Sequence, residues 1–149
     1  MTLCRIDKVN TMTTNEFKSL EKEFILDEDI EHKELDTLIR RMLKFCKVDK
    51  KGFVIIPNAK KLIVLDRILL VLGARNLANK LQIVIGQEST IKKEVTIDEL
   101  ENILKEKREV ILARIKDLRD NGSIETPEKG VYTAAIHAVK SLLEKIENE

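Results

Sequence analysis

The chain has 149 residues, of which 43% are hydrophobic and 36% are charged, and its net charge is +1 at pH 7. This composition excludes an intrinsically disordered chain and is typical of a folded protein with an aliphatic core. Only 3% of the residues are aromatic and there is no Trp, which argues against a protein that stacks single-stranded bases on aromatic rings.

The composition also bears on metals, disulfides and membranes. Cys4 and Cys46, together with two His, are too few for a disulfide framework or a zinc site, so we expect no metal and a reducing cytoplasm. The longest apolar stretch, near residues 62–72, is interrupted by charges and is too short to span a bilayer. The first residues contain no long apolar run of the kind found in signal peptides. These patterns predict a cytoplasmic protein that does not contact a membrane.

The N-terminal third of the chain predicts an arm and two helices. Residues 1–13 are mixed and polar, and we expect a mobile arm there. Thr13 and Glu16 make a possible capping box for a first helix, with apolar residues at helical spacing at Phe17, Leu20 and Phe24. A second helix of about five turns is indicated by a long apolar stripe, which consists of Leu35, Leu38, Ile39, Met42, Leu43 and Cys46.

The middle of the chain predicts a short strand and a central helix. Residues 47–52 are typical of a turn, and residues 53–56 form a β-branched run that Pro57 ends. From about Asn58 to Gln82 apolar residues cover most of the helical circumference, so this helix belongs at the centre of a packed structure or at a subunit interface. Small residues where another helix could approach closely are Gly73, Ala74 and Ala78.

Residues 96–133 predict two short helices followed by a β-hairpin. Thr96 and Glu99 have the spacing of a capping box at the start of the first helix. Residues 121–122, Asn-Gly, end the second helix, and residues 127–130 make the tip of a hairpin. A last amphipathic helix is expected from about Ala134 to Glu147.

The segment 96–125 resembles the helix-turn-helix half of prokaryotic winged-helix regulators. The family pattern has Leu-x-x-x-Leu, a turn, Val-x-x-x-Leu-x-x-Leu and then x-Gly-x-Ile, and the matching positions are Leu100, Leu104, Ile111, Ile115, Leu118, Gly122 and Ile124. Helical spacing predicts that Ile111, Ile115 and Leu118 face inward. The match covers about a quarter of the chain, and the domain it implies extends over about residues 94–134. The chain departs from the pattern at Lys105 and Glu106, where the family favours a turn Gly followed by an apolar residue, so we expect either a tighter turn or a first helix that continues further.

The resemblance implies a fold class and a partner. The fold would be mainly α with a small β-hairpin wing, with a helical N-terminal part packed on a C-terminal winged helix. The function would be that of a DNA-binding protein, a transcriptional regulator or an accessory protein of a mobile element, with double-stranded DNA as its partner. The Ile- and Lys-rich composition is compatible with an archaeal source.

The resemblance also implies DNA-contacting residues at the start of the second helix and on the wing. Arg108 and Lys116 could donate to guanine edges or phosphates, while Leu112 could only touch a thymine methyl group or apolar surface. The full set of expected DNA-binding residues is Lys107, Arg108, Leu112, Ala113, Lys116, Arg119 and, at the wing tip, Lys129.

The charge balance keeps a second interpretation open. Residues 89–149 carry 11 basic and 13 acidic groups, a net charge of −2, whereas a DNA-binding module usually presents a basic face. The same cations could be a solvated helix face with paired charges, such as Lys105 with Glu109 and Lys116 with Asp120. The alternative is therefore a winged helix that binds a protein partner through Leu112 and Ala113 and does not bind DNA.

Three further expectations concern organisation. No phosphate-binding loop, HExxH or GxSxG motif is present, so we expect neither catalysis nor a cofactor. Wide apolar stripes on the predicted helices near residues 30–46, 58–82 and 134–147 favour a homodimer. The expected organisation is an arm at 1–13, a helical part at 14–90, and a winged helix with its C-terminal helix at 91–149.

Overall fold

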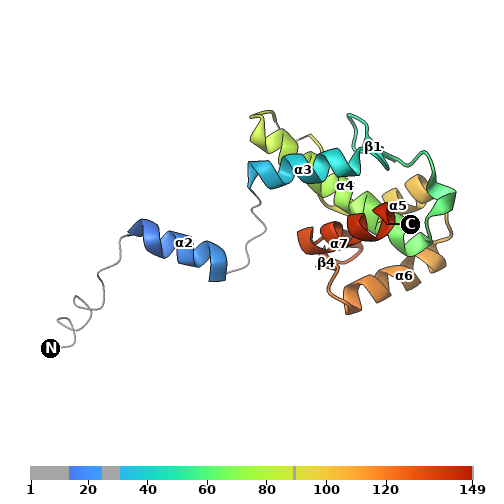
Figure 1. The fold of residues 1–149 in the computed structure, drawn as a ribbon. Coiled ribbons are helices and arrows are strands. Elements are labelled where there is room, and N and C mark those ends of the chain that lie inside the picture. The colour runs from blue at the N-terminus through green and yellow to red at the C-terminus, as the bar shows by residue number, and fades with distance from the viewer. Residues whose placement is uncertain (1–13, 25–30, 89, 149) are drawn as a thin grey trace. The chain divides into compact units, whose positions relative to one another are not determined.

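The computed structural model describes residues 14–24, 31–88 and 90–148 (Figure 1). Contacts divide the chain into two compact units, Met1–Ile30 and Glu31–Glu149. The first unit contains α2 (Thr14–Phe24), an amphipathic helix of 11 residues. The predicted arm 1–13, with the capping residue Thr13, lies outside the described residues.

The second unit is built around α4 (Val64–Val84). This helix contacts α3, α5, α6, α7 and β5, and its residues from Ile68 to Leu77 are all buried. The prediction of a central helix is confirmed, but the predicted start at Asn58 is wrong. A 3₁₀ turn, η1 (Ala59–Lys61), comes first, and extended residues lead from it to the N-cap Ile63, whose carbonyl accepts from the N–H of Arg67 at 3.0 Å.

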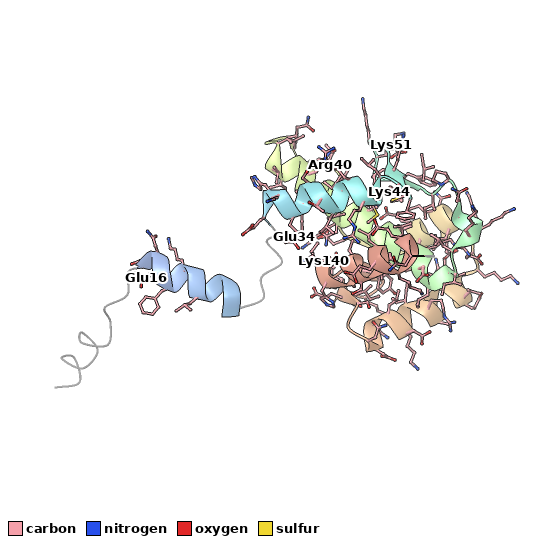
Figure 2. The ribbon with its side chains drawn as sticks, viewed as in Figure 1. Glu16, Glu34, Arg40, Lys44, Lys51 and Lys140 are labelled. Atoms are coloured by element: carbon pink, nitrogen blue, oxygen red, sulfur yellow. The ribbon has the colours of Figure 1, made fainter. Side chains whose placement is uncertain are left out.

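The helix before the central one is shorter than its apolar stripe predicts. α3 (His32–Met42) buries Leu35, Leu38 and Met42, but it ends before Leu43, whose side chain is 54% exposed. The chain turns at this point, since the N–H of Cys46 donates to the carbonyl of Met42 at 3.1 Å. α3 packs on α4 and α7, and an ion pair between Glu34 on α3 and Lys140 on α7 joins the two helices (Figure 2).

The predicted strand at 53–56 pairs with residues from the segment 47–52, which the sequence predicts to be a turn. β1 (Lys47–Val48) and β2 (Val54–Ile55) pair antiparallel, with Val48 opposite Val54. Asp49 forms the turn between them, because its carboxylate accepts from the backbone N–H groups of Lys51 and Phe53 at 2.8 and 2.9 Å.

The C-terminal half of this unit has the order strand, helix, helix, hairpin, helix. The elements are β3 (Val95–Thr96), α5 (Ile97–Leu104), α6 (Arg108–Asp120), β4 (Ile124–Glu128), β5 (Val131–Ala134) and α7 (Ile136–Glu147). The three strands form one antiparallel sheet in the order β3-β5-β4. The fold class is therefore confirmed: the protein is mainly helical, with β4 and β5 forming a small β-hairpin wing.

Helix α7 packs against α4 and α3, and the apolar residues of its stripe are buried. The two helices lie close together at Gly73 of α4, where an added Cβ would lie 2.9 Å from a methyl group of Val139. This stripe is buried within the chain, so α7 supplies no free apolar face for a dimer. Residues on both sides of the expected boundary at 90 and 91 belong to the same compact unit. In the described residues, no helix combines the length and the apolar character that crossing a bilayer requires.

Candidate nucleic-acid interface

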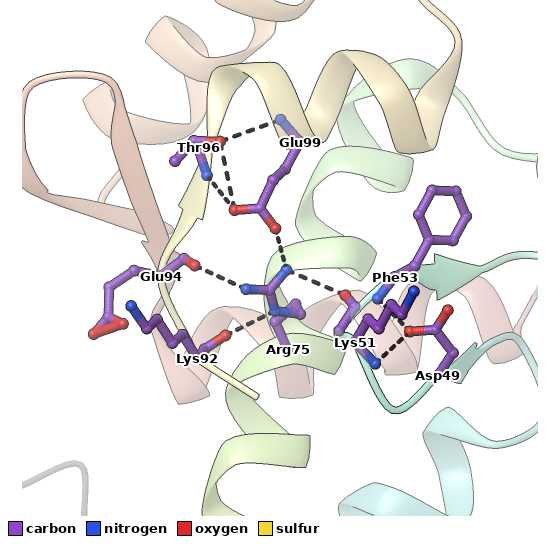
Figure 3. A network of polar contacts seen from close by, with 9 residues as sticks. Asp49, Lys51, Phe53, Arg75, Lys92, Glu94, Thr96 and Glu99 are labelled. Carbon is purple, nitrogen blue, oxygen red and sulfur yellow. Dashed lines mark hydrogen bonds and ion pairs between the residues drawn. The ribbon is translucent and has the colours of Figure 1, made fainter. Parts of the chain in front are cut away.

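The candidate interface begins with a capped helix. The hydroxyl oxygen of Thr96 accepts from the N–H of Glu99 at 3.2 Å, and the carboxylate of Glu99 accepts from the N–H of Thr96 at 3.3 Å (Figure 3). This reciprocal capping box confirms the pattern in the sequence and fixes where α5 starts.

A buried arginine attaches this capped end to the central helix. Nη1 of Arg75 on α4 donates to Glu99 at 2.6 Å, and the guanidinium also donates to three backbone carbonyls (Figure 3). Those carbonyls belong to Gly52, Lys92 and Glu94, at 3.1, 2.7 and 3.1 Å. One side chain therefore holds the β1–β2 turn, the segment before β3 and the start of α5 in place.

The backbone conformation of Lys105 explains how the chain turns between α5 and α6 without the glycine of the winged-helix pattern. Lys105 takes the left-handed conformation with φ 57°, which glycine adopts more easily, and its N–H donates to the carbonyl of Glu101 at 2.9 Å. The first helix therefore ends at Leu104 and does not continue into the turn. Lys107 is the N-cap of α6.

Helix α6 has the inward and outward faces that its sequence predicts. Ile111, Ile115 and Leu118 are at most 2% exposed and face the core. The predicted DNA-binding residues all have exposed side chains: Lys107, Arg108, Leu112, Ala113, Lys116 and Arg119 lie on α6 or at its N-cap, and Lys129 lies at the hairpin tip. The outward face of α6 and the hairpin tip are therefore exposed in the second unit.

Among the predicted DNA-binding residues, Arg108 has the surroundings that differ most from expectation. Its guanidinium forms ion pairs with Asp98 and Glu101, two carboxylates of α5. The hydrogen bond to Glu101, followed by its negative charge, raises the pKa of Arg108. Sequence reasoning missed this partnership, because the pairing depends on how sharply the chain turns at Lys105. The positive charge of Arg108 is thus largely balanced within the protein.

The remaining cations of α6 are arranged differently from the predicted pairs. Nε of Arg114 lies 3.2 Å from Oδ2 of Asp117 and forms an ion pair with it. The expected ion pairs of Lys105 with Glu109 and of Lys116 with Asp120 do not form. Nζ of Lys105 instead lies 3.4 Å from the amide oxygen of Asn102. Within residues 31–88 and 90–148, Lys116 and Arg119 form no ion pair. One turn apart on the exposed side of the helix, they are cations available to an external anion.

Apolar side chains are also exposed on α6. Leu112 is 43% exposed, and Val110, which the sequence analysis did not single out, is 38% exposed. The outward surface of this helix therefore combines available cations with aliphatic side chains. Acidic groups on the same helix are Glu109, Asp117 and Asp120.

The described residues contain no group of three or more His, Cys, Asp or Glu side chains placed to hold a metal ion. No model of a protein family matches this chain, and no match was found among curated proteins or among solved structures.

Proposed function

We propose that this chain is a winged-helix protein that binds double-stranded DNA and acts as a homodimer in the cytoplasm, as a transcriptional regulator or an accessory protein of a mobile element. The observation that carries the proposal is the exposed outer side of α6 with its available cations Lys116 and Arg119. The order of α4, β3, α5, α6 and the β4–β5 hairpin supports the winged-helix assignment.

In this proposal α6 enters the major groove and the hairpin tip reaches the adjacent backbone. A B-DNA major groove admits one α-helix, and exposed cations on that helix can donate to phosphates or to guanine edges. Lys129 at the tip is in a position to contact a second phosphate. Binding of this kind depends on counterion release, so the affinity should fall steeply with salt.

The ion pairs of Arg108 change which residues we expect to make the main DNA contacts. Because Arg108 is held by two carboxylates of α5, we assign the main DNA contacts to Lys107, Lys116 and Arg119. Arg108 serves first to hold α6 against α5. The charge reversal Arg108→Glu would place a third carboxylate beside two others, so it is a poor test of DNA binding.

A cleaner test reverses Lys116 and Arg119 together. We expect the wild-type protein to retard a mixed-sequence duplex at low salt and to bind it more weakly at moderate salt. The double variant Lys116→Glu/Arg119→Glu should lose at least tenfold in affinity with an unchanged circular dichroism spectrum. The matched control is Lys33→Glu/Arg40→Glu on α3, which makes the same change in net charge on a helix that packs on α4 and α7.

A protein-binding role is the second candidate, and Val110 and Leu112 favour it. Two exposed aliphatic side chains on one helix fit a partner's apolar surface better than they fit phosphates. If the folded wild-type protein retards no duplex at low salt, DNA binding is excluded. The alternative would then be tested by Leu112→Glu against any captured partner.

A further inference from the structure

An apolar groove lies between α3, β1 and the C-terminal half of α4. Its hollow measures about 300 Å³, and the side chains that form its walls include Ile39, Met42, Leu43, Val48, Leu81 and Ile85. Within the described part of the chain, Lys47 is the one charged residue in the lining. This groove is formed by other helices than the candidate DNA-binding surface on α6.

The groove is poorly suited to water. At about 30 Å³ for each molecule, a hollow of this size would hold on the order of ten waters. The amide of Gln82, one of the lining residues, is occupied, since it donates to the hydroxyl of Thr90 at 3.1 Å and accepts from the N–H of Ile91 at 2.9 Å. At the rim Leu43 and Ile85 are 54% and 56% exposed. An apolar occupant would therefore be favoured over solvent.

The same chain carries a helix with an exposed apolar stripe. In α2, Phe17 and Leu20 are 47% and 46% exposed. A helix of 11 residues is marginal in water unless a partner covers its apolar face. The sequence spacing of Phe17, Leu20 and Phe24 is the i, i+3, i+7 spacing by which helices bind in apolar grooves.

The charges of the two surfaces are complementary. α2 carries three acidic groups, Glu16, Glu21 and Glu23, and two basic groups, Lys18 and Lys22, a net charge of −1. Lys47 lines the groove, and the exposed charged residues that adjoin lining residues in the sequence include Lys92, Asp49, Glu88 and Lys44, the last of which is paired with Glu147. Lys47, the charged residue in the described part of the lining, is therefore opposite in sign to the net charge of α2.

We propose that the groove binds α2 of a second copy of this chain, and that two copies exchange these helices about a two-fold axis. Each chain has one helix and one groove, so a reciprocal pair leaves neither surface exposed. Any role of this dimer in DNA binding rests on the proposed function. The assembly itself needs no DNA, so its failure and the failure of DNA binding can be told apart.

The test measures the mass of the full-length protein without DNA across a range of concentrations. We expect a dimer of the wild-type chain that dissociates on dilution. Ile85→Glu in the groove and Leu20→Glu on the helix should each weaken dimerisation at least tenfold. The matched control is Ile63→Glu at the other end of α4, since Ile63 is 59% exposed and Ile85 is 56% exposed, and it should leave the dimer intact.

Mixing the two defective variants tests the pairing itself. A heterodimer of the Leu20→Glu chain and the Ile85→Glu chain contains one intact helix that faces one intact groove. Mixing should therefore restore association to a level between those of the variants and the wild type, while each variant alone stays monomeric.

Three results would overturn the proposal. The first is a wild-type chain that stays monomeric at a concentration of about 100 μM, well above the micromolar range in which specific dimers form. The second is a dimer that Ile85→Glu leaves unchanged. The third is a mixture that recovers no association while both variants keep the wild-type melting temperature.

Discussion

Nη1 of Arg75 donates to Oε2 of Glu99 at 2.6 Å, and this contact joins the central helix to the first helix of the candidate interface. The Arg75 side chain is 5% exposed and that of Glu99 is 41% exposed. The same carboxylate closes the capping box with Thr96. The position of α5, and through it that of α6, therefore depends on one acidic side chain.

Glu99→Ala should destabilise the protein by about 2–3 kcal/mol. The change removes a helix cap, worth about 1 kcal/mol, and the carboxylate partner of a buried guanidinium, which keeps only its backbone carbonyls. The measurement is urea unfolding followed by circular dichroism. Asp98→Ala, in the same helical turn but 81% exposed, is the control and should cost less than 1 kcal/mol. Equal losses in the two variants would contradict the role assigned to Glu99.

The sequence predicted the parts of this region that depend on local rules. The capping box at Thr96 and the inward face of α6 follow from spacing along one helix, and both are confirmed. The ion pairs of Arg108 and the network of Arg75 could not be predicted, because their partners are brought together by turns and by residues up to 24 positions apart. Hydrophobic spacing also predicted too long an α3, because Leu43 continues the apolar stripe but lies in the following turn.

Gly73→Ala should destabilise the protein by about 1–3 kcal/mol, the usual cost of overpacking a core. The new Cβ would lie 2.9 Å from a methyl group of Val139, and a buried β-branched side chain has little freedom to move. Thermal unfolding of Gly73→Ala in the wild-type and Val139→Ala backgrounds checks the cause. In the second background the cost should disappear, since alanine favours helix by about 1 kcal/mol over glycine. Additive effects would mean that the helices do not meet at this point.

Lys105→Gly should stabilise the protein by about 0.5–1 kcal/mol. A left-handed conformation costs an L-residue about 1–2 kcal/mol, and this gain exceeds the extra flexibility of glycine in the unfolded chain. The measurement is the shift in the urea midpoint. Lys116→Gly, in the middle of α6, removes the same charge and should instead cost about 1 kcal/mol. A loss of stability in both variants would show that the turn at 105 is not strained.

Glu147 makes part of the stability pH-dependent. It accepts from Arg41 Nη2 at 2.7 Å and from Arg41 Nε at 3.1 Å, and this hydrogen bonding lowers the pKa of Glu147. Because the folded-state pKa is the lower one, the contribution is fully present at neutral pH and is lost as the pH falls below about 4.

The comparison of Glu147→Gln with the wild type at two pH values tests this contribution. The variant should be less stable than the wild type at pH 7, and the difference should shrink at pH 3, as measured by urea unfolding. Glu125→Gln, an exposed change on β4, serves as the control and should differ little from the wild type at either pH. A difference for Glu147→Gln that is the same at both pH values would contradict the assignment.

The last prediction concerns the two carboxylates that hold Arg108. The double variant Asp98→Asn/Glu101→Gln should release the guanidinium for contact with phosphate, so the affinity for duplex DNA should rise. The slope of log affinity against log salt should steepen by about 0.9, the value expected for one more phosphate contact. The control Glu34→Gln/Asp36→Asn on α3 removes the same two charges from another helix, and it measures the effect of net charge alone. If both variants change the slope equally, Arg108 does not face the DNA, and α6 would bind through Lys107, Lys116 and Arg119 without it.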